Sequence, residues 1–172
     1  VFAISGMGWA PQAFTIDWCR AQGLDLIPGD GYLPACVPAV VGTWALALAR
    51  FGTMSFSQVL QPAIELATQG FPVYPRLHDS LRANVRKFTE LYPTTGAVYY
   101  PNGHLPEVGD VLRNADFAHT LHILCTAEAE HRHKGRVAGL EAARDAFYAG
   151  PIAERIVAFI TQHPVEVASG TA

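Results

Sequence analysis

The sequence predicts an α+β chain that is mostly helical. Several segments carry apolar residues at helical spacing, and prolines and glycines separate these segments at short intervals. The length of 172 residues suits one domain or part of one. Half of the residues are hydrophobic and only 16% are charged, which excludes a disordered chain.

The first forty residues are expected to hold a strand, a helix and a long loop. Residues 1–5 are apolar and predict a strand that ends at two glycines. Pro11 suits the first turn of a helix over residues 12–22, because that position needs no N–H donor. Gly23 would end this helix, and residues 24–38, rich in proline and glycine, predict a loop.

Two helices are expected next. Residues 40–50 predict a buried helix that ends at Gly52. Ser55 and Gln58 have the spacing of a capping box, in which two side chains satisfy free N–H groups at the start of a helix. The helix behind them is apolar on one face, and Pro62 inside it predicts a kink or a division into two short helices.

The second half of the chain alternates helices with turns. Residues 77–91 predict a more polar helix, and residues 93–96 predict a turn. Asn114 is expected to cap a helix over residues 115–127. Two more helices are expected, at residues 140–147 and from Pro151 onward.

Histidines gather late in the chain, with a cysteine and two glutamates among them: His119, His122, Cys125, Glu128, Glu130, His131 and His133. His119 and His122 could share a helix face, as metal ligands do, but the spacing matches no zinc signature. We therefore expect a solvated polar helix end without a metal. Cys125 is expected to be a small buried hydrophobe rather than a nucleophile with His122 as its base.

Charge and composition weaken other classes of function. The net charge of −3 argues against a nucleic-acid partner, so the basic residues Arg76, Arg82, Arg86 and Lys87 are expected to face water. No dinucleotide cofactor is expected, because Pro11 stands where a Gly6-Met7-Gly8 turn would need its third glycine. The longest apolar stretch, residues 35–49, is too short for a membrane span.

Four segments, taken in order, resemble the gamma-glutamyltransferase family of N-terminal-nucleophile hydrolases. The first is Gly8-Trp9-Ala10-Pro11. The second lies within residues 37–73 and reads VPAVVGTW, RFGT, LQPAIELA and GFPV, which is the most specific part. The third and fourth lie within residues 109–121 and 145–153. The ordered set covers about residues 1–160.

The resemblance implies that residues 1–163 belong to the middle of the family's large subunit, with residues 164–172 as a tail. The implied structure is a fragment of a four-layer αββα fold, which would expose a large apolar face where the missing sheet belongs. Family members cleave themselves, and the new N-terminal Thr of the small subunit attacks a gamma-glutamyl amide. The acyl group then passes to water or to an amino acid.

The implied partners are a glutathione-like amide substrate and the missing small-subunit segment, and the resemblance implies no metal or organic cofactor. Members are often exported, so the compartment is left open between periplasmic or extracellular and cytoplasmic. No residue of this chain is expected to be the nucleophile, because residue 1 is Val and presents no Thr amine.

Gly6, Met7, Gly8 and Trp9 are the residues expected to bind substrate. Typical members carry, at the position of Met7, an Arg that binds the alpha-carboxylate of the substrate. Met7 offers only apolar surface, which leaves open a cephalosporin-acylase-like or other amidohydrolase with a different acyl group. A non-catalytic helical binding domain is the alternative outside the enzymes.

Overall fold

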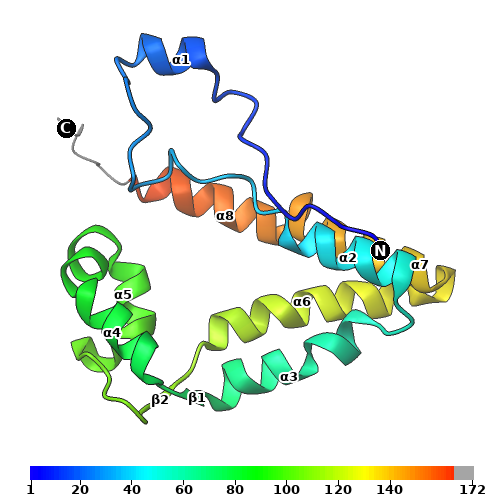
Figure 1. The fold of residues 1–172 in the computed structure, drawn as a ribbon. Helices are drawn as coiled ribbons and strands as arrows, with labels where there is room; N and C mark the ends of the chain where they lie inside the picture. The colour runs from blue at the N-terminus through cyan, green and yellow to red at the C-terminus, as the bar shows by residue number, and fades with distance from the viewer. Residues whose placement is uncertain (165–172) are drawn as a thin grey trace.

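The computed structural model describes residues 1–164 and is mostly helical, as the sequence predicts (Figure 1). In chain order the elements are α1 (Ile16–Ala21), α2 (Val40–Phe51), α3 (Phe56–Gln69), β1 (Phe71–Pro72), α4 (Pro75–Ala83), α5 (Pro93–Tyr99), β2 (Val111–Leu112), α6 (Ala115–His131), α7 (Arg136–Tyr148) and α8 (Pro151–Gln162). Nearly all of the tail expected at residues 164–172 lies outside the described residues.

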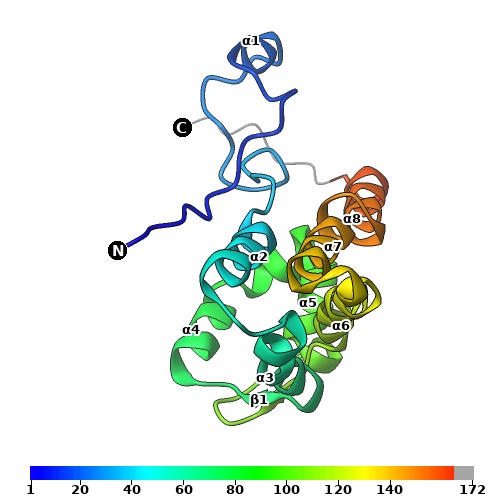
Figure 2. The ribbon, with the colours of Figure 1, turned by 90° about the vertical axis from the view of Figure 1, so that its right-hand side faces the viewer.

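The main core lies where α2, α3, α6 and α7 pack together, and Figure 2 shows these helices close to end-on. Phe56, Leu60 and Ile64 repeat every four residues and so lie on one face of α3. Leu121 and Leu124 meet them from α6. Each such side chain contributes about 1.5–3 kcal/mol when it leaves water, so this interface is the main source of stability.

A second, smaller core lies under α4 and α5 and consists of Val73, Leu81, Tyr100 and Leu112. β1 and β2 pair antiparallel at its base, with Phe71 opposite Leu112. The hydroxyl of Tyr100 donates to the carbonyl of Leu81 at 2.7 Å. The two-residue strands thus close a lobe formed by the residues between them (Figure 1).

The capping box predicted at the start of α3 is confirmed. The Ser55 side chain accepts from the backbone N–H of Gln58, and the Gln58 side chain accepts from the backbone N–H of Ser55. α3 continues through Pro62 as a single helix, so the alternative of two short helices is wrong. Core contacts of Leu60 and Ile64 on either side of Pro62 stabilise the helix across this position.

The strand predicted at residues 1–5 is absent from the structure of residues 1–164, where this segment is extended and largely exposed. A strand needs a neighbour for its N–H and C=O groups, and within the described part of the chain β1 and β2 pair only with each other. The helix predicted at residues 12–22 is shorter. It begins after Thr15, whose side chain accepts from the Trp18 N–H at 3.1 Å, so a side-chain cap rather than Pro11 sets its start.

Other boundaries also differ from prediction. The turn predicted at residues 93–96 is the first half of α5, because Pro93 occupies a helix start where no N–H is needed. The helix predicted at residues 77–91 divides into α4 and a separate π-helical turn over Lys87–Leu91. α2 is amphipathic rather than buried, since Val41 and Ala45 are its buried residues.

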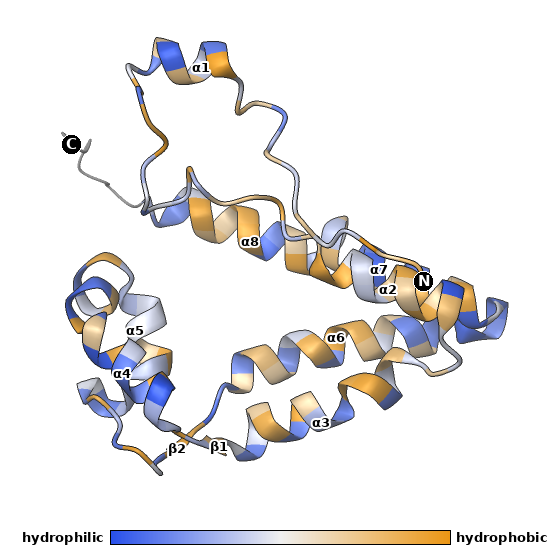
Figure 3. Ribbon diagram, viewed as in Figure 1, coloured by the Kyte–Doolittle hydropathy of each residue, from blue (hydrophilic) through white to orange (hydrophobic). Residues whose placement is uncertain are grey.

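The chain exposes a large apolar surface, as the resemblance predicts. Residues 1–38 contribute much of this surface. They extend away from the helices, and α1 lies far from the core in both Figure 1 and Figure 2. Figure 3 shows the hydrophobic positions along this segment. Phe2, Met7, Trp9 and Ile16 are each more than two-thirds exposed. Within residues 1–164, no helix has the length and apolar character needed to span a membrane.

Candidate functional site

Residues 6–9, where the sequence predicts a turn, form neither a turn nor a bend, and they lie against the segment that leads into α2. The backbone N–H of Val37 donates to the carbonyl of Trp9 at 2.9 Å. A Cβ atom added at Gly8 would lie 2.1 Å from the Val37 carbonyl oxygen, far inside van der Waals contact. Gly8 is therefore required for the close approach of these two backbone segments.

The structure does not bring all four predicted site residues to one surface. Trp9 lines a hollow of about 470 Å³, whose wall comes from residues 4–5 and 9–12, from the segment 37–39 and the start of α2, and from Tyr148. Gly6 lies beside Thr43, since an added Cβ would be 3.1 Å from the Thr43 Oγ1 atom. Met7 is 79% exposed and is not part of this wall. We call this cavity the Trp9 hollow.

The Trp9 hollow is almost wholly apolar. None of the side chains that line it is a carboxylate, an amine or a guanidinium. A second hollow, of about 460 Å³, shares Pro11, Val37, Pro38 and Tyr148 with it and continues to the apolar face of α8. These surfaces suit an uncharged ligand body, and polar recognition has to come from hydroxyl, amide or indole groups.

Tyr148, at the end of α7, is a residue that the sequence analysis did not select. The backbone N–H of Gly42, in the first turn of α2, donates to the Tyr148 hydroxyl at 3.0 Å. The N-cap residue of α2, Ala39, makes no side-chain cap, so Tyr148 satisfies one of the free N–H groups of that helix. Its only sequence signal is that it lies in the fourth family-like segment.

The basic residues of the α4 region are mostly paired. Arg82 lies 3.4 Å from Asp79, and Arg86 lies 2.9 Å from Glu90. Lys87, which was expected simply to face water, pairs instead with Asp30 of the N-terminal loop. This pair therefore connects the loop with the smaller lobe.

The histidine-rich segment is only partly the solvated helix end that was expected. His119, His122 and His133 are exposed, but Glu128 is buried. Its carboxylate accepts from the backbone N–H groups of Phe56 at 2.9 Å and Ser57 at 3.1 Å. Within residues 1–164 no group of three or more metal-binding side chains is arranged to hold an ion.

Cys125 is partly buried and packs against the main core, in agreement with its expected role as a small hydrophobe. Burial raises the pKa of the Cys125 thiol. The thiol is therefore mainly protonated at neutral pH, which is the opposite of what a nucleophile needs.

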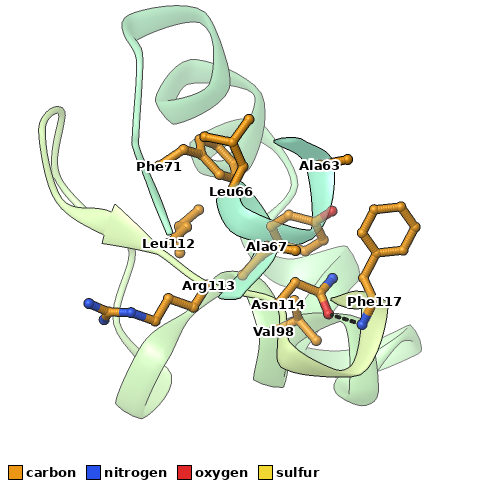
Figure 4. A pocket seen from close by; sticks show the side chains of 10 residues that line it. Ala63, Leu66, Ala67, Phe71, Val98, Leu112, Arg113, Asn114 and Phe117 are labelled. Atoms are coloured by element: carbon orange, nitrogen blue, oxygen red, sulfur yellow. Dashed lines mark hydrogen bonds between the residues drawn. The ribbon is translucent and has the colours of Figure 1, made fainter. Parts of the chain in front are cut away.

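Another hollow, of about 430 Å³, lies between α3, the β1–β2 pair, α5 and the start of α6 (Figure 4). Apart from Arg113 and Asn114 its wall is formed by apolar and aromatic side chains. The Asn114 side chain accepts from the Phe117 N–H at 2.9 Å, and the Arg113 guanidinium extends away from the other side chains in Figure 4. No set of polar groups converges here, so the Trp9 hollow is the better candidate.

Comparisons with known proteins agree on one family. The model of the family described as gamma-glutamyltranspeptidase matches residues 1–168. The acylase ACY 1 proenzyme of a Pseudomonas species is 34% identical over 107 residues, which is 62% of this chain and 19% of the relative. The glutathione hydrolase proenzyme of Escherichia coli is 30% identical over 107 residues, 62% of this chain and 18% of the relative.

A solved structure supports the same assignment. The crystal structure of a cephalosporin acylase from Bacillus halodurans superposes with a TM-score of 0.76 at 28% identity, and covers 95% of this chain and 29% of its own. The chain thus spans about a fifth of the length of the two curated relatives, and less than a third of the solved one.

Proposed function

Because the chain belongs to the gamma-glutamyltranspeptidase family, we propose that residues 1–163 form part of the large subunit of an amidohydrolase. The family match over residues 1–168 carries this proposal. The enzyme would cleave a gamma-glutamyl or related amide, such as glutathione, and transfer the acyl group to water or to an amino acid. In the whole protein these helices would cover the sheets of a four-layer αββα fold.

The nucleophile in this proposal is the N-terminal Thr of a small-subunit segment. The freed amine of that residue would act as the base, so that nucleophile and base belong to one residue. The names of the two curated relatives, both proenzymes, support a precursor that is processed before it is active. Of the four residues expected to bind substrate, Trp9 would contribute to the wall of the substrate site, and Gly6, Met7 and Gly8 would lie beside it in the same segment.

A second candidate, an acylase with a non-glutamyl acyl group, is favoured by the Trp9 hollow. A gamma-glutamyl group carries an alpha-carboxylate, which is best bound by a bidentate Arg. Met7 stands where that Arg is expected, and no charged side chain lines the hollow. The similarity to proteins named as acylases supports the same candidate.

The test is an assay of the intact protein that contains this chain. We expect the purified protein to appear as two processed fragments and to hydrolyse gamma-glutamyl-p-nitroanilide, an uncharged acyl p-nitroanilide, or both. The ratio of kcat/KM for the two substrates separates the two enzyme candidates. A protein that is neither processed nor active on either substrate would instead support a non-catalytic binding domain.

The substitution Met7→Arg in the intact protein should raise the preference for gamma-glutamyl over uncharged acyl amides. A charge-assisted hydrogen bond contributes about 1.5–3 kcal/mol, which corresponds to a shift in the kcat/KM ratio of about tenfold or more. Met54→Arg is the matched control, because Met54 is also exposed but lies between α2 and α3. An unchanged ratio in Met7→Arg, at unchanged Tm, would show that Met7 is not at the carboxylate position.

A further inference from the structure

The hydroxyl of Tyr148 lies at the wall of the Trp9 hollow. Its oxygen is 3.0 Å from the backbone nitrogen of Gly42, and both Gly42 and Tyr148 line that hollow. The Tyr148 ring packs edge-on against Phe147, with 4.9 Å between ring centroids. Contacts with a helix start and with a neighbouring ring therefore fix the position of this hydroxyl group.

The O–H of Tyr148 is a hydrogen-bond donor that no group within residues 1–164 accepts. A phenolic hydroxyl can accept a hydrogen bond and donate one. The Gly42 N–H occupies its acceptor side, and among residues 1–164 its own O–H has no acceptor. Two other tyrosines use their O–H as a donor: Tyr100 donates to the Leu81 carbonyl, and Tyr32 donates to the His163 carbonyl.

Ser5, Gln12 and Trp9 also line the hollow and carry side-chain donors, but within residues 1–164 no hydrogen bond holds those side chains, whereas the Gly42 N–H holds the Tyr148 hydroxyl. The Thr43 hydroxyl, the other one on the α2 side of the hollow, donates to the Ala39 carbonyl at 2.9 Å and is already used. Among residues 1–164, no charged side chain lines the hollow. A hydroxyl that accepts from a backbone N–H also becomes a somewhat stronger donor, because hydrogen bonds in a chain polarise one another.

We propose that Tyr148 contacts the substrate and donates a hydrogen bond to an oxygen atom at the far end of its acyl group. This inference rests on the proposed amidohydrolase function and deepens it. The apolar wall would hold the methylene part of the acyl chain, and Tyr148 would select chains that end in a carboxylate or an amide carbonyl over those that end in a methyl group.

The experiment compares wild type and Tyr148→Phe in the intact protein with two substrates of matched length, glutaryl-p-nitroanilide and pentanoyl-p-nitroanilide. Loss of one hydrogen bond to a charged or polar acceptor should lower kcat/KM for the glutaryl substrate about tenfold, mainly through KM. The pentanoyl substrate, which has no acceptor at its end, should be hydrolysed as by wild type.

Tyr92→Phe is the matched control. The Tyr92 hydroxyl also accepts from a backbone N–H, that of Gly31 at 2.6 Å, but Tyr92 does not line the Trp9 hollow. This variant should keep the wild-type ratio of the two substrates. An equal loss for both substrates in Tyr148→Phe, together with a lower Tm, would show that Tyr148 only supports α2 and would overturn the proposal.

Failure of the proposed function gives a different result. If the wild-type protein hydrolyses neither substrate, calorimetric titration with glutarate and with pentanoate tests Tyr148 by binding alone. Weaker binding of glutarate to Tyr148→Phe, with pentanoate unaffected, would still support the hydroxyl contact. Equal affinity of both proteins for glutarate, or no binding of glutarate by wild type, would overturn it.

Discussion

Single side chains from neighbouring helices satisfy the free backbone groups at several helix ends. Glu128 of α6 accepts from two N–H groups at the start of α3, and Tyr148 of α7 accepts from one in the first turn of α2. Arg136 of α7 donates to the carbonyls of Leu48 and Ala49 near the end of α2. Such contacts fix how the helices lie relative to one another, because they act only when the partner helix is in place.

At the residue scale, Cys125 should be slow to alkylate at neutral pH. Burial raises its pKa, so at any pH below that pKa the reactive thiolate is scarcer than in a free cysteine. Labelling by iodoacetamide should therefore increase at a higher pH than for free cysteine, and peptide mass spectrometry measures it. Cys36, which is exposed, provides a labelled site in the same sample. Labelling of Cys125 as fast as that of free cysteine at pH 7 would contradict this expectation.

At the scale of elements, the start of α3 is satisfied twice. The local capping box of Ser55 and Gln58 uses side chains of the same segment, whereas Glu128 reaches it from α6. Glu128 is 3% exposed and Phe56 is fully buried, so water cannot replace the carboxylate at the Phe56 N–H. The contact between α3 and α6 therefore depends on a buried carboxylate as well as on apolar packing.

Glu128→Ala should lower the free energy of unfolding by about 2–3 kcal/mol, because it leaves the buried Phe56 N–H unsatisfied, removes the part-buried contact to Ser57 and removes core volume. Urea denaturation monitored by circular dichroism measures the change. Glu130→Ala is the control, since Glu130 is exposed on the same helix and should change stability little. A similar small effect from both variants would mean that the Glu128 contacts contribute little to the folded state.

At the scale of the whole molecule, the 172-residue chain on its own should not hydrolyse gamma-glutamyl-p-nitroanilide. In the proposed reaction the Thr amine belongs to a small-subunit segment, and among residues 1–164 no carboxylate, imidazole or amine lines the Trp9 hollow. The comparison is with the same chain after heat treatment. Turnover clearly above that background would contradict the proposed division of the site between two segments.

Much of the secondary structure follows from the sequence alone. The apolar face of α3, the capping box at Ser55 and the helix ends at Gly52 and Gly70 depend on contacts within a few residues, which the sequence displays directly. The cap at Asn114 is of the same kind. The order of the family-like segments also identified the family, because it needs no knowledge of the fold.

Only the tertiary structure decided the features that depend on distant partners. Residues 1–5 have the composition of a strand but no strand beside them within the described chain, so their backbone stays unpaired. Glu128 follows Leu121 and Leu124 at helical spacing, but its charge predicts a solvated position. The structure instead buries its carboxylate, which accepts from two N–H groups at the start of α3. The hydroxyl of Tyr148 likewise accepts from the N–H of Gly42, which lies in a helix more than a hundred residues earlier in the chain. Local patterns cannot show such contacts, because the partner is chosen by how the helices pack.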